Sequence, residues 1–91
     1  MNAQNTKITY QDMEVTVKNL ASKTTKSVEA PVSIPEGKEF LGASILGNGY
    51  NGGVLQSICY LSNARIAVTF QNDEYSAKES ITATVRLALI G

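Results

Sequence analysis

The side chains most able to do chemistry lie in two polar segments that interrupt the apolar runs of this chain. Segment 47–53 places Tyr50 between asparagines in a glycine-rich stretch, and segment 72–79 holds the only adjacent acidic pair, followed by a tyrosine. An aromatic face beside amide or carboxylate groups can hold a sugar ring by stacking and hydrogen bonding. We therefore expect two loops that bind such a ligand. The ligand-binding residues predicted in this way are Asn48, Tyr50, Asn51, Asp73, Glu74 and Tyr75.

The glycine-rich segment also has a simpler explanation. Its glycines and asparagines tolerate positive φ, so 47–53 can equally be a plain mobile connection. A phosphate-binding loop is not supported, because the Lys-Ser/Thr ending and the following helix are missing. Whether the two loops meet at one end of the molecule does not follow from the sequence.

Catalytic residues are scarce. The chain has no histidine, which excludes triads with an imidazole base and the commonest zinc sites. Cys59 lies in the apolar run 54–61 without a nearby base, so we expect a buried, inert thiol. Asp73 and Glu74 could serve a glycan hydrolase or a calcium ion, but neighbours on an extended loop point apart and further ligands are missing. We predict no enzyme, no metal and no cofactor.

Length and charge exclude several classes of protein. At 91 residues the chain is expected to form one domain, 1–91, in which residues 1–7 are a flexible polar lead. Eight basic and eight acidic residues are interspersed without blocks, which favours neither nucleic acid nor a membrane surface as a partner. There is no signal peptide and no run long enough to span a bilayer, so we expect synthesis in a cytoplasm. A core this small gains from self-association, and balanced charge lets identical copies pack.

The apolar residues recur with a period close to two, which predicts strands throughout. Regular spacing of short strands and turns predicts an all-β fold, a small antiparallel β-sandwich of six to seven strands, jelly-roll or Ig-like. Pro31 places its strand, 28–34, at an edge or a bulge, and Pro35 is expected at the second position of a turn. Two runs, 40–46 and 54–61, are apolar on both sides and are predicted to be central or covered on both faces; a helix at 54–61 is the less favoured alternative.

The closing run predicts both a core strand and an interface. Its first residues alternate, with one set expected to face the core and Thr82, Thr84 and Arg86 on the other face. The core set is Ile81, Ala83, Val85 and Leu87. Ala88 and Ile90 extend the outer face, so we predict an interface with another copy at Arg86, Ala88 and Ile90. Cover by a loop or by the N-terminal segment of the same chain is the alternative.

The remaining tyrosines, Tyr10 and Tyr60, are expected to be structural. One lies near the first predicted strand and the other at the end of a half-buried run. An amphipathic ring is well placed at a core margin, where its apolar part is covered and its hydroxyl is wet. We therefore predict that both rings lie at the margin of the core.

The order of these segments over residues 24–91 resembles the carboxy-terminal head modules of bacteriophage tail fibres and receptor-binding proteins. The matching motifs are the turn Ile34-Pro35-Glu36-Gly37-Lys38-Glu39-Phe40-Leu41-Gly42 and the strand Thr82-Ala83-Thr84-Val85-Arg86. The resemblance implies a non-enzymatic structural protein of the virion tail, made in a bacterial cytoplasm, with a homotrimer as the favoured assembly and a host-surface saccharide as ligand. Such heads usually follow a long shaft, whereas this sequence has a short polar lead, so a separate small protein or an excised domain is expected.

A second function remains open. The chain could be a small monomeric or dimeric inhibitor or regulator of a mobile element that docks on a host protein. Mixed charge and an exposed edge strand suit docking by strand addition. A trimer with its loops at one end would favour the fibre tip, and a monomer or dimer with one free edge the inhibitor.

Overall fold

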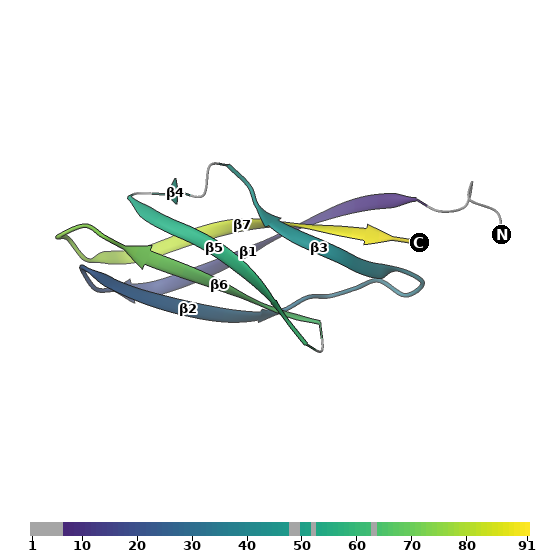
Figure 1. Cartoon of the computed structure of the whole chain (residues 1–91), viewed down its shortest axis with the longest axis horizontal. Coiled ribbons are helices and arrows are strands. Elements are labelled where there is room, and N and C mark those ends of the chain that lie inside the picture. Colours follow the sequence, from purple (N-terminus) through teal and green to yellow (C-terminus); the bar gives the residue numbers. More distant parts are fainter. Residues whose placement is uncertain (1–6, 48–49, 52, 63) are drawn as a thin grey trace.

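The structure is a computed structural model that describes residues 7–47, 50, 51, 53–62 and 64–91. The predicted ligand residue Asn48, and the lead except for Lys7, lie outside the described residues. Every regular element of the described part is a strand (Figure 1). The strands are β1 (Ile8–Leu20), β2 (Thr24–Pro31), β3 (Glu39–Ile45), β4 (Tyr50–Asn51), β5 (Val54–Leu61), β6 (Arg65–Asn72) and β7 (Lys78–Ile90). No helix in these residues is long and apolar enough to cross a membrane.

The strands form two antiparallel sheets packed as a sandwich, which confirms the predicted fold class. One sheet has the order β1-β7-β3 and the other the order β2-β6-β5-β4. Because β4 contributes only two residues, each sheet has three full strands. The body is long and thin, with extents of 56 × 24 × 15 Å. Each sheet therefore has an inner face toward the other sheet and an outer face toward solvent.

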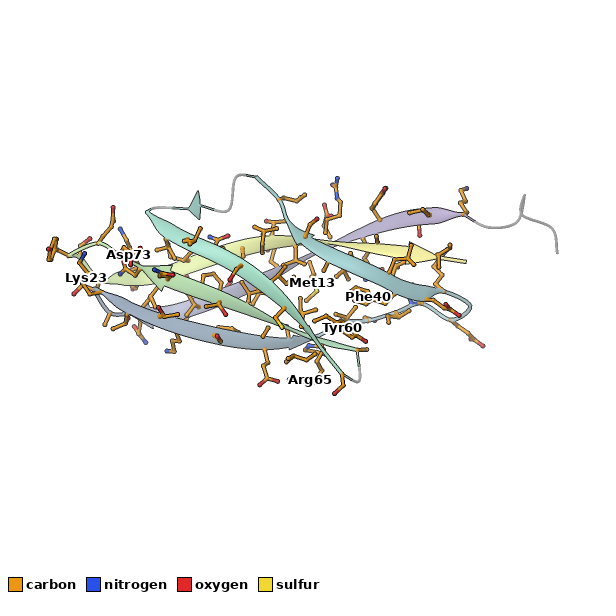
Figure 2. The ribbon with its side chains drawn as sticks, viewed as in Figure 1. Met13, Lys23, Phe40, Tyr60, Arg65 and Asp73 are labelled. Atoms are coloured by element: carbon orange, nitrogen blue, oxygen red, sulfur yellow. The ribbon has the colours of Figure 1, made fainter. Side chains whose placement is uncertain are left out.

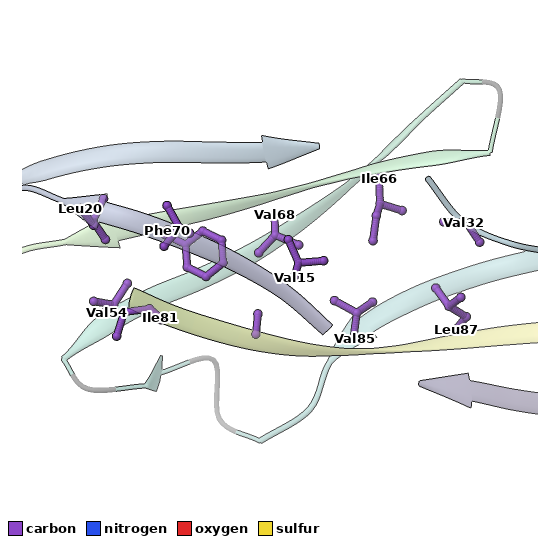
Figure 3. Close-up of a cluster of buried hydrophobic side chains, with 12 residues drawn as sticks. Val15, Leu20, Val32, Val54, Ile66, Val68, Phe70, Ile81, Val85 and Leu87 are labelled. Carbon is purple, nitrogen blue, oxygen red and sulfur yellow. The ribbon is translucent and has the colours of Figure 1, made fainter. Parts of the chain in front are cut away.

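The two sheets bury one continuous core between their inner faces (Figure 3). The closing strand β7 is the central strand of its sheet, and its alternate residues from Ile81 to Leu87 are buried, as predicted. From the facing sheet, β6 contributes Ile66, Val68 and Phe70, all with no exposed surface. The period of two thus places one apolar set from each long strand in the core.

The first strand is longer than the sequence indicated. It begins at Ile8 and pairs with β7 from Ile8 opposite Ile90 to Leu20 opposite Lys78. The polar segment 19–24 predicts a turn that includes Leu20, but this residue is only 1% exposed. Asn19, with φ of 55°, shifts the alternation by one residue, so Val17 and Leu20 both face inward.

The connection from β2 to β3 crosses from one sheet to the other. As predicted, the strand with Pro31 is an edge strand; it ends at Pro31, before Val32 and Ile34. These two side chains still pack against the core. The turn that follows differs from the prediction: Lys38 N donates to the carbonyl oxygen of Pro35 at 3.2 Å, so the proline is its first residue and not its second.

Two predictions about the doubly apolar runs are wrong. The run 40–46 is not central, because β3 is an edge strand, and Leu41 is 52% exposed where a bulge shifts the register between Phe40 and Gly42. The run 54–61 is a strand, as preferred over a helix, but Cys59 is exposed and not buried. Pairing with β6 turns Val54, Gln56 and Ile58 toward the other sheet, so the period of two turns Cys59 outward.

Candidate functional site

Three connections meet at one end of the sandwich, which we call the loop end: the β1–β2 turn, the β6–β7 loop and the β4–β5 hairpin (Figure 1). The main chain joins the first two, since Lys23 N donates to the carbonyl oxygen of Glu74 at 3.2 Å. Gly53 brings in the third, because a Cβ atom at this position would overlap the carboxylate of Glu74. The two loops that the sequence could not place relative to each other are therefore neighbours.

Asn72 organises the loop end and was missed by the sequence analysis. It is fully buried, and its Nδ2 donates to the carbonyl oxygens of Ala21, at 3.1 Å, and Ser76, at 3.0 Å. Its Oδ1 accepts from Glu74 N at 3.0 Å. One side chain thus satisfies backbone groups of two connections, which a buried amide needs in order to offset its lost hydration. In a sequence, an asparagine before Asp-Glu indicates only a turn, so no signal distinguished it.

The predicted residues of the β6–β7 loop diverge. Asp73 accepts from Gln71 Nε2 with both carboxylate oxygens at 3.1 Å, whereas Glu74 Oε1 lies 2.6 Å from Lys78 Nζ. Tyr75 is 90% exposed, and the Nζ atom of Lys23 lies 4.3 Å from the centroid of its ring. Lys23 and Asp73 lie at the same end of the molecule in Figure 2. The loop end therefore presents one open aromatic ring beside carboxylates that are already paired.

The predicted residues of the other loop lie at the same end. The backbone of Tyr50 pairs with Leu55, and that of Asn51 with Val54. This two-residue strand is held beside Gly53, the residue that lies against Glu74. The structure thus brings the backbone of Tyr50 and Asn51 to the connection that carries Asp73, Glu74 and Tyr75.

The predicted interface residues share the outer face of the three-stranded sheet. Across this face, Ile90 lies between Ile8 and Glu39, Ala88 between Tyr10 and Gly42, and Arg86 between Asp12 and Ser44. Tyr10 is 66% exposed and Ile8 53%. We call the residues Ile8, Tyr10, Leu41, Ala88 and Ile90 the apolar half of this face.

A shallow hollow of about 230 Å³ lies where the apolar half meets Arg86, and its lining includes Tyr10, Gly42, Ala88 and Arg86. The expectation that Tyr10 sits at a core margin is wrong, because the period of two turns it to the outer face. Tyr60 does lie at the margin of the core, where its ring stacks on Phe40 with centroids 5.0 Å apart (Figure 2).

A charged pair borders the apolar half. Arg86 Nε and Nη2 donate to the two carboxylate oxygens of Asp12 at 2.9 and 3.1 Å, a bidentate arrangement across neighbouring strands. The hydrogen bond from Arg86 holds the pKa of Asp12 below its ordinary value, and the carboxylate in turn raises the pKa of Arg86. Arg86 also lies 5.8 Å from the ring centroid of Tyr10. The predicted interface residue Arg86 is therefore already paired within its own chain.

A second hollow, of about 430 Å³, lies where β1 and β7 reach the loop end and is lined by residues that include Lys18, Lys78 and Glu79. None of the predicted ligand residues lines either hollow. Among the described residues no group of three acidic or cysteine side chains could hold a metal ion. Comparison with known proteins found no matching family model, no matching curated protein and no matching solved structure.

Proposed function

We propose that this protein is a non-enzymatic structural module of a bacteriophage or prophage, a tail-fibre or receptor-binding head domain. It assembles, as a trimer, through the outer face of the three-stranded sheet and contacts a host-surface glycan through the loop end. Its place is the virion tail. The observation that carries the proposal is the apolar half of that outer face.

The apolar half gathers much of the exposed apolar surface. Three of the six large hydrophobic residues that are exposed in the described chain, Ile8, Tyr10 and Leu41, lie on it. Ala88 and Ile90, only half-buried, continue it along the central strand. Exposed apolar side chains gathered on one face, here with Glu39 beside Ile90, are typical of protein interfaces, and each Å² of apolar surface removed from water contributes about 25 cal/mol. A small sandwich gains from this burial the stability that its own thin core lacks.

The positions of the chain ends fit presentation at a tip. Lys7 O accepts from Gly91 N at 3.1 Å, so the two ends of the described chain lie together. They lie at the end of the body opposite to the β1–β2 turn (Figure 1). A module attached through either end would therefore hold the loop end outward, where Tyr75 meets a surface.

Assembly is tested by light scattering on purified protein with the variant Ile90→Asp. We expect Ile90→Asp to stay folded and to lose the trimeric contact that the wild type makes through this face, because the new charge cannot be desolvated in an apolar contact. Ser80→Asp is the control: it introduces the same charge on the outer face of the same strand, at the polar end of that strand. A wild type that is strictly monomeric at high micromolar concentration would contradict the assembly.

Glycan binding is tested on an immobilised panel of bacterial surface polysaccharides and on host cells. We expect Tyr75→Ala and Tyr50→Ala each to weaken binding at least tenfold, whereas Tyr75→Phe, which keeps the ring, binds as the wild type does. Unchanged thermal unfolding must accompany the loss. If the folded double variant still binds host cells like the wild type, the loops are not the contact surface.

A further inference from the structure

The edges of the two sheets differ in how they are protected against pairing. The edge strand β2 carries Lys26 and Glu29 and ends at Pro31, which has no N–H to donate. The edge strand β3 begins with Glu39 and is broken by the bulge at Leu41. The edge strand β1 carries charges along its outer face. Those residues are Asp12, Glu14 and Lys18. Charge, proline and bulges are the usual means of keeping a strand edge from pairing with another chain.

The remaining edge has none of these devices. From Val54 to Leu61, β5 contains no charged residue, no proline and no glycine, and its pairing with β6 runs without a break. On its other side β4 pairs only with Val54 and Leu55. In the described chain no strand pairs with 56–61 on that side. Every second residue of this stretch therefore has N–H and C=O groups that no strand of the described chain pairs with. Of these groups, the carbonyl oxygen of Tyr60 accepts only the weak hydrogen bond of Cys59 Sγ, at 3.6 Å.

Exposed apolar surface accompanies these free backbone groups. Tyr60 is 56% exposed at this edge although its ring stacks on Phe40 of the other sheet (Figure 2). On the outer face, Ser57 and Cys59 are small and exposed, so they leave room for an approaching strand. A strand added here would gain main-chain hydrogen bonds and cover an aromatic ring at the same time.

We propose that β5 pairs antiparallel, within the stretch 56–61, with the same strand of a second copy around a two-fold axis, which joins two sheets into one. A two-fold pairing uses the same segment on both sides, so it needs a segment that does not repel itself. The stretch carries no charge, and the whole chain has a net charge of zero. Two-fold dimers are also the commonest closed assemblies. This surface is separate from the apolar half, and the inference does not rest on the proposed function.

Geometry selects the register of this pairing. Residues opposite each other in an antiparallel pair share a face, so the two-fold axis must pass through either Ile58 or Cys59. An axis at Ile58 would carry the partner strand as far as Leu55, where β4 already lies. An axis at Cys59 ends the pairing at Ser57 and avoids this clash. The two Cys59 residues then face each other with Cα atoms about 4.5–5.5 Å apart, within the range that a disulfide can bridge.

The test is oxidation of the purified protein with diamide, which takes up the two hydrogens that the thiols lose as a disulfide forms. We expect a covalent dimer on a non-reducing gel, formed at least tenfold faster than in a double variant, Cys59→Ser with Ser27→Cys. In that variant the thiol lies on the protected edge strand β2. Positions 27 and 57 pair with the same residue of β6, so they lie in one row across the sheet. Ser57→Lys should slow the reaction at least tenfold, because a charge is buried at the pairing edge. Ser27→Lys, the matched change on β2, should not.

Hydrogen exchange of the wild-type protein gives a second measurement, which does not depend on whether a variant folds. Amides that point outward in 56–61 should exchange more slowly as protein concentration rises, whereas those of β2 should not change. Ile90→Asp should leave both the cross-linking and the protection unaltered, which separates this edge from the outer face. The proposal is overturned if cross-linking at Cys59 is no faster than at position 27, or if both lysine variants slow the cross-linking equally. It is also overturned if the protection of 56–61 does not depend on protein concentration, because another segment of the same chain would then cover this edge.

Discussion

The loop end and the apolar half lie toward opposite ends of the long strands β1 and β7. They differ in whether their side chains find partners within the chain or stay exposed to solvent. At the loop end, Asn72 and the Lys78–Glu74 pair satisfy polar groups within one copy of the chain. On the apolar half, Tyr10 and Ile8 are more than half exposed, and the described residues do not cover them. One short domain therefore combines an end whose polar groups are paired within the chain and a face whose apolar side chains stay exposed.

The largest effect is expected from removing the amide that holds the loop end together. Asn72→Ala leaves buried backbone groups of two connections without their partner, at about 1–3 kcal/mol for each group that water does not reach. We expect a loss of about 2–4 kcal/mol in the free energy of unfolding, measured in urea.

Gln71→Ala is the control for this change. Its amide is next in sequence but donates only to exposed Asp73, so a change within about 0.5 kcal/mol is expected. Equal losses for the two variants would show that the loop end does not depend on Asn72. Polar groups paired within the chain would then not distinguish the loop end from the apolar half, and the contrast between the two regions would disappear.

A smaller effect tests the contact between the two loops. Gly53 has φ of 80° and faces the carboxylate of Glu74, so Gly53→Ala adds backbone strain of about 1–2 kcal/mol and a steric overlap. In the double variant with Glu74→Ala the overlap disappears and only the strain remains. A double-mutant cycle of unfolding free energies should therefore show a coupling between the two positions. Strict additivity would mean that the loops do not touch.

The smallest effect concerns the charged pair at the border of the apolar half. Because the pKa of Asp12 is lowered in the folded state, the pair stabilises the fold above the unfolded pKa of an aspartate, and this contribution is lost as pH falls through the folded value. Asp12→Asn should thus lower the melting temperature at neutral pH and have a vanishing effect in strong acid.

Salt provides the control for this pair. Both side chains are over two-fifths exposed, so the difference between Asp12→Asn and the wild type should shrink in high salt. A difference that is the same in acid and at neutral pH would contradict the ion pair as its cause.

The sequence predicted most of the fold and less of the surface. The alternation of Ile81 to Leu87 identified a core strand, because alternate residues of a strand point to opposite faces and only one of the two sets is apolar. It could not place Cys59, since a run that is apolar on both sides fits either phase and the pairing with β6 decides. Nor could it show that Leu20 is in the core, because the change of phase depends on the backbone at Asn19.

The candidate site divides in the same way. Aromatic and acidic residues in loops could be recognised by type, but the meeting of Gly53 with Glu74 is a contact between distant parts of the chain. Asn72, which holds the loop end, differs from an ordinary turn asparagine only in its burial. The outward position of Tyr10 depended on a strand that begins at Ile8, seven residues before the first valine that indicated it.

The ladder between β1 and β7 determines how the domain bears mechanical load. Ile8 is opposite Ile90, so pulling the two chain ends apart opens the ladder one rung at a time, and a small force is enough. Tension between the N-terminal end and the loop end instead runs along β1, and the cross-strand hydrogen bonds, which lie perpendicular to the strands, are loaded together in shear. A module anchored at its N-terminal end and gripped at its loop end would resist pulling in its strongest direction.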